Sequence, residues 1–128
     1  MEISVRVSPG ELLDKVSILE IKREKIGDPE KLANVEAEIR ALKGPYDAVV
    51  GADARLVDLY RALVEVNSQL WEIEDDIRVC EARKDFGDAF IGLARAVYRT
   101  NDKRAAIKKE INLLLNSDLV EEKSYEEY

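Results

Sequence analysis

Residues 56–80 have the sequence LVDLYRALVEVNSQLWEIEDDIRVC, and their apolar spacing decides the fold. Apolar side chains recur every three or four residues along this stretch without a break. They are Leu56, Leu59, Leu63, Val66, Leu70, Ile73, Ile77 and Cys80. Such spacing is typical of a helix with a continuous apolar seam, which requires a long antiparallel partner. We therefore predict a helix over about residues 53–84 and a second over about 89–115, paired as a hairpin around the turn between them.

Two proline-containing start signals predict two shorter helices before this hairpin. Ser8-Pro9 and Asp28-Pro29 each combine an N-cap side chain with a proline that suits the first helical turn. We expect the resulting helices to cover about residues 9–26 and 29–43, and Gly44-Pro45 to stop the second one.

The two ends of the chain suggest a small β element. Ile3, Val5 and Val7 alternate with polar residues, so residues 2–7 are predicted to form a short strand. A lone strand needs a partner for its backbone groups, either part of the C-terminal tail (116–128) or the same strand of a second subunit. The expected fold is thus a single all-α domain, an antiparallel helical bundle built on a long two-helix hairpin, with a minor terminal β pairing.

Composition excludes several functional classes. The net charge of −7 gives the chain no general attraction to nucleic acid or to anionic membranes, so neither is expected as a partner. There is no histidine, which removes Ser-His and Cys-His nucleophilic systems. The single cysteine, Cys80, lies on the apolar seam and is interpreted as buried and inert. A lone cysteine, no targeting segment and no membrane-length apolar run favour a cytoplasmic location.

Strong polar groups interrupt the apolar stripe of the last helix. Between Val97 and Ile111 this stripe passes through Asn101, Arg104 and Lys108, where core residues are expected. Burial of such groups without partners is costly, so they must either meet partners in a cleft or mark a place where the helix leaves the core. Residues 88–112 also carry six basic and three acidic side chains in an otherwise acidic chain. This local excess is compatible with an anion site.

A second polar line follows the seam of the 53–84 helix at spacings of four, three and four residues: Asn67, Trp71, Glu74 and Arg78. Antiparallel pairing would bring both polar sets to one inter-helical groove, with Tyr98 beside it. We therefore predict that these eight residues bind a small anionic ligand or an acidic group of a partner: Asn67, Trp71, Glu74, Arg78, Tyr98, Asn101, Arg104 and Lys108. The alternative is structural, with Glu74–Arg78 an i,i+4 pair and Arg104 bound to Glu74 or another carboxylate.

Carboxylate pairs provide a weaker hypothesis. Glu11 with Asp14, and Glu72 with Asp75, have the E-x-x-D spacing that can hold Mg²⁺ or Mn²⁺ in all-α nucleotide pyrophosphatases. The surrounding motif is thinner than that class requires, and charge runs on helices are usually solvated. We therefore expect no metal and no other cofactor.

Three stretches together resemble a bacterial domain-of-unknown-function family of small helical proteins. They are SPGELLDKVSILEIK, LWEIEDDIR and YRTNDKR, which begin at Ser8, Leu70 and Tyr98. The similarity covers nearly the whole chain. It implies family membership and a helical fold, but no catalytic residues.

Three functions remain open from the sequence. The favoured one is a binding or accessory module, which leans against an enzyme but leaves that question open. The second is a purely structural interaction protein, a homodimer suggested by the wide apolar surface of the 9–26 helix. The third is a small helical enzyme, either pyrophosphatase-like or chorismate-mutase-like, in which Arg78, Arg104 and Lys108 would clamp two carboxylates.

Overall fold

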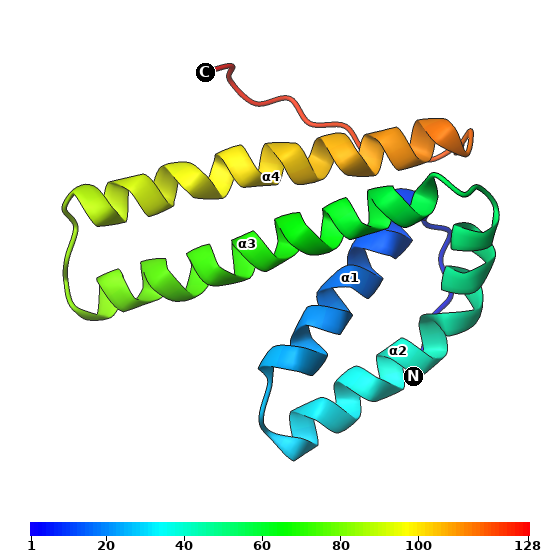
Figure 1. Ribbon diagram of the computed structural model, residues 1–128, viewed down its shortest axis with the longest axis horizontal. Helices are drawn as coiled ribbons and strands as arrows, with labels where there is room; N and C mark the ends of the chain where they lie inside the picture. The colour runs from blue at the N-terminus through cyan, green and yellow to red at the C-terminus, as the bar shows by residue number, and fades with distance from the viewer.

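The computed structural model describes residues 1–128 and contains four helices: α1 (Pro9–Lys25), α2 (Pro29–Gly51), α3 (Leu56–Ala82) and α4 (Asp88–Leu114). The all-α prediction is confirmed. Helices α3 and α4 run antiparallel as a long hairpin, and α1 and α2 form a second, shorter pair across one half of it (Figure 1). None of the helices combines the length and the apolar character that crossing a membrane requires.

The core lies where α1 meets the open end of the hairpin. It is a cluster of seven buried side chains: Leu12, Leu13, Val16, Leu56, Tyr60, Leu63 and Ile111. Helix α1 lies between α2 and the hairpin, and it contacts α2, α3 and α4. The wide apolar surface of α1, from which the sequence suggested a dimer, is therefore covered within one chain.

The other half of the hairpin has no such cover. No residue between Asn67 and Thr100 is buried, although the apolar seam continues through this region. We call residues 68–99 the arm and the remaining part of the bundle the base. In Figure 1 the arm is the end of the hairpin that extends beyond α1 and α2. The hairpin is thus one continuous element with two different environments.

Helix α2 does not stop at Gly44-Pro45, as predicted, but continues to Gly51. Proline removes one helical hydrogen bond and bends the helix, and α2 changes direction along its length (Figure 1). The turns after Pro45 place Tyr46 and Val50 against the core, and the Tyr46 ring packs edge-on against Tyr60 at 5.2 Å. Tertiary burial therefore outweighs the local stop signal.

The terminal β pairing is also wrong. Residues 1–8 and 115–128 contain no strand, and the side chains of Ile3, Val5 and Val7 are 51–79% exposed. The apolar side chains do alternate with polar ones, but they meet no apolar surface on which a strand could pack. The C-terminal tail follows α4 instead, held by ion pairs such as Lys109–Glu122 at 3.6 Å (Figure 1).

Candidate functional site

A buried carboxylate connects α1 to the hairpin. Asp14 lies on α1 and is 1% exposed. Arg104 of α4 donates from Nε to Asp14 Oδ1 at 2.8 Å and from Nη2 to Oδ2 at 2.5 Å. This side-on pairing uses two of the three guanidinium nitrogens and fixes the plane of the group. The interruption predicted at Arg104 is therefore filled by a partner carboxylate from another helix.

Helix α3 joins the same network through Asn67. Its Nδ2 donates to Asp14 Oδ1 at 2.9 Å and to Ser17 Oγ at 2.8 Å. The Ser17 hydroxyl donates in turn to the carbonyl oxygen of Asp14 at 2.6 Å. One carboxylate thus holds three helices in register.

Lys108 lies one turn further along α4 and is 6% exposed. Its Nζ donates to Glu11 Oε2 at 2.8 Å, lies 2.7 Å from Glu121 Oε2, and is 3.8 Å from Asp14 Oδ2. Glu121 comes from the C-terminal tail, so the same ammonium group anchors that segment. Three carboxylates around one ammonium leave Lys108 little capacity for an external anion.

The pKa values of these groups follow from their mutual contacts. Burial by itself raises the pKa of Asp14, but hydrogen bonds from Arg104 and Asn67 bring it below the usual 3.8. Burial lowers the pKa of Lys108, but hydrogen bonds to Glu11 and Glu121 bring it above 10.5. Both groups are therefore charged at neutral pH, and their partners offset the cost of desolvation.

Close backbone contact brings α1 against α4 beside this network. The backbone N–H of Gly10 donates to Asn112 Oδ1 at 2.8 Å. A Cβ atom at Gly10 would stand 2.5 Å from the carbonyl oxygen of Lys108. Only glycine allows this approach, which brings Asp14 within reach of Arg104.

A groove of about 400 Å³ opens beside the network, where the base meets the arm. Six of the eight predicted site residues line it together with Ile18, Leu70 and Asp75: Asn67, Trp71, Glu74, Arg78, Asn101 and Arg104. The two others lie elsewhere. Lys108 is enclosed by carboxylates, and Tyr98 lines a separate pocket with the C-terminal tail, where its ring packs against Tyr128.

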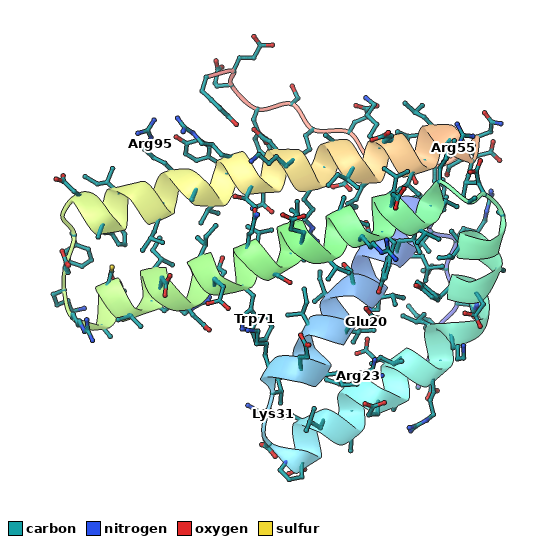
Figure 2. All side chains as sticks on the ribbon, viewed as in Figure 1. Glu20, Arg23, Lys31, Arg55, Trp71 and Arg95 are labelled. Carbon is teal, nitrogen blue, oxygen red and sulfur yellow. The ribbon has the colours of Figure 1, made fainter.

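Several polar groups of the groove have no partner within the chain. They are Nη1 of Arg104, the amide of Asn101 and the indole N–H of Trp71. Figure 2 shows Trp71 extending from α3 toward the C-terminal turns of α1. Residues of α3 and α4 that carry unused donors therefore line one opening.

Both contacts of the structural alternative proposed from the sequence are present. Arg78 donates from Nη1 to Glu74 Oε2 at 2.7 Å as an i,i+4 pair. Arg104 binds another carboxylate, as that alternative allowed, and this carboxylate is Asp14 and not Glu74. All three cations of the chorismate-mutase-like hypothesis, Arg78, Arg104 and Lys108, already have carboxylate partners within the chain.

The two E-x-x-D pairs do not form a common site. Glu11 and Asp14 bind Lys108 and Arg104, and Glu72 lies 3.2 Å from the Nζ atom of Lys25. No group of three or more acidic or cysteine side chains is arranged to hold a metal ion, and the three carboxylates around Lys108 are no exception.

The sequence interpretation considered Asp14 only as a metal ligand and overlooked Ser17, Gly10 and Asn112. A signal was present, because Gly10, Asp14, Ser17 and Ile21 follow one another at helical spacing on the apolar side of α1. Polar and small residues on that line mark a place where another helix comes close.

The fold and the network together define a small four-helix protein whose hairpin is fixed at one end by a buried ion pair. The chain belongs to DUF6165, a family of unknown function, whose model matches residues 3–128. No curated protein and no solved structure matches the chain.

Proposed function

We propose that the protein is a binding module whose inter-helical groove takes a carboxylate or similar anionic group from a ligand or partner on the unused edge of Arg104. The observation that carries this proposal is the divided use of the guanidinium. Nε and Nη2 are held by buried Asp14, while Nη1 has no partner within the chain and Arg104 lines the groove. A guanidinium fixed in this way loses little entropy when it binds a further acceptor.

The groove has no excess positive charge, so a ligand would be recognised by directional hydrogen bonds and not by net charge attraction. Arg104 is offset by Asp14 and Arg78 by Glu74, while Asp75 adds one negative charge. An incoming carboxylate would accept hydrogen bonds from Arg104 Nη1, the Asn101 amide and the Trp71 indole. Asp75 favours a ligand that also carries a cationic or hydroxyl group.

The only tryptophan of the chain lies in the groove, so its fluorescence reports occupancy directly. We expect glutarate to change the Trp71 emission saturably and inorganic phosphate to do so more weakly. The diamine putrescine, which lacks an anionic group, serves as the contrasting probe. Asn101→Ala should weaken glutarate binding without disturbing the Asp14–Arg104 pair.

Arg104→Lys is the sharper variant, because it keeps a positive charge near Asp14 and removes the Nη1 edge. The affinity of this variant for glutarate should be at least about tenfold lower, because one charge-assisted hydrogen bond is lost. Arg95→Ala is the matched control, since Arg95 is exposed on α4 and projects away from the groove (Figure 2). An unchanged response in Arg104→Lys, or no response to any anion in the wild type at a dilution where it is monomeric, would leave the network with a structural role alone.

A further inference from the structure

We propose that the acidic group received by the groove is the α3–α4 turn of a second copy of this chain, and that two arms pack antiparallel to place it there. This inference rests on the proposed function of the groove and identifies its partner. The turn contains Asp85 and Asp88, both exposed, at the far end of the arm.

The first supporting observation is the missing cover of the arm. Its apolar seam is as regular as the seam of the base, yet none of its residues is buried. Phe86 and Ile91 are each 51% exposed. Two helices alone enclose no core, and helical bundles bury such seams with further helices.

The second observation is that the face covered by α1 at the base continues along the arm. On α4, Arg104 contacts α1, and the same helical line continues toward the turn through Asn101, Ala94 and Phe90. On α3, Asn67 contacts α1, and its line continues through Trp71, Glu74 and Arg78. We call the resulting surface the open face, formed by Trp71, Glu74, Arg78, Phe90, Ala94 and Val97. The open face extends the surface that α1 covers at the base, and no helix of the same chain packs on it.

The third observation is that the open face is self-complementary in charge. Glu74 and Arg78 are four residues apart on one helix line. An antiparallel copy centred between them places Arg78 of each chain opposite Glu74 of the other. The two pairs within the chains then become a four-membered network across the interface. This symmetry favours a second copy over an unrelated partner.

The fourth observation is that the same centre brings the turn to the groove. On α3, Asn67 of the groove lies nine residues before Asp76, and Asp85 of the turn lies nine residues after it. On α4, Arg104 and Phe86 lie nine residues on either side of Arg95. A two-fold axis at this level therefore superposes the turn of each chain on the groove of the other, with Asp85 and Asp88 of the second copy near Arg104.

Charge exchange tests this arrangement in sedimentation velocity over a range of concentrations. The wild type should form a dimer. Glu74→Arg alone and Arg78→Glu alone place like charges opposite each other twice, and each should weaken the dimer at least about tenfold. An equimolar mixture of the two variants restores both opposite-charge pairs and should dimerise again. A mixture that stays monomeric overturns the antiparallel register, and a monomeric wild type overturns the dimer.

Matched substitutions test the face and the turn. Ala94→Glu, on the open face, should abolish dimerisation, while Val79→Glu, an exposed arm position on another face of α3, should not. Asp85→Asn combined with Asp88→Asn should weaken the dimer, and equal association would show that the turn does not occupy the groove. Circular dichroism of each variant confirms that it is folded.

The two proposals fail separately. If the Ala94→Glu monomer still binds glutarate at Trp71 but the wild type never dimerises, the groove function stands and the second copy is refuted. If the wild type dimerises and the Ala94→Glu monomer ignores glutarate, the groove is no carboxylate site. In that case the turn cannot be its ligand, even though the arms associate.

Discussion

The base and the arm are built from the same two helices, yet they are held together differently. In the base, α1 adds a third wall, so Leu63 and Ile111 are fully buried and Asp14 is sealed among its donors. In the arm, the seam residues of α3 and α4 meet only each other and stay partly exposed. The difference follows from the length of α1, which ends at Lys25.

This comparison shows that an apolar seam specifies pairing but not burial. A regular stripe is sufficient to align α3 with α4 over their whole length. Stability, however, depends on how many helices share the stripe, because hydrophobic stabilisation scales with the area removed from water. The base should therefore unfold last, and the arm should open first.

Removal of the central carboxylate should have the largest effect. Asp14→Asn leaves partly buried Arg104 and buried Lys108 without their common partner, and it should cost about 3–5 kcal/mol in the free energy of unfolding. Asp75→Asn, an exposed carboxylate of the arm, should change it by less than about 0.5 kcal/mol. Urea unfolding followed by circular dichroism measures both. Similar losses in the two variants would contradict the distinction between base and arm.

Truncation of seam residues should follow the same division. Leu63→Ala opens a cavity in the core and should cost about 2–5 kcal/mol, because Leu63 is completely buried. Ile77→Ala, on the same seam in the arm, should cost about 1 kcal/mol at low protein concentration. A larger effect of Ile77→Ala at higher concentration would report cover by a second copy.

Alanine substitutions of one glycine in the base and one in the arm should change stability in opposite directions. Gly10→Ala in the base forces a Cβ atom to within 2.5 Å of the Lys108 carbonyl oxygen, so α1 must shift away from α4. We expect a loss of about 1–3 kcal/mol. Gly92→Ala in the arm meets no atom within 4 Å inside a helix, and should stabilise by about 0.5–1 kcal/mol. Thermal melts of the two variants should move in opposite directions, and a shift of the same sign would refute this reading of Gly10.

The helical periodicity was sufficient to predict the four helices and the hairpin because local apolar spacing reflects pairing directly. It also identified Arg104 and Lys108 as groups that need partners. It could not identify Asp14 as that partner, since the contact spans 90 residues and depends on how α1 crosses α4. The same limit explains two errors made where local signals were strong. At Pro45, burial of the following turns against the core outweighed the stop signal, and at Ile3 the alternating apolar side chains found no surface to cover.

The smallest expected effect compares two half-exposed carboxylates and depends on pH. Glu121→Gln in the base removes an acceptor from buried Lys108 and should cost up to about 1 kcal/mol at pH 7, whereas Glu74→Gln in the arm should cost about 0.3–0.5 kcal/mol. The hydrogen bond from Lys108 lowers the pKa of Glu121 below 4.5. Its contribution is therefore fully present above pH 4.5 and is lost as the pH falls through the lower value in the folded state. The difference between wild type and Glu121→Gln should disappear at acid pH, and a constant difference would mean that the Lys108–Glu121 contact does not form in solution.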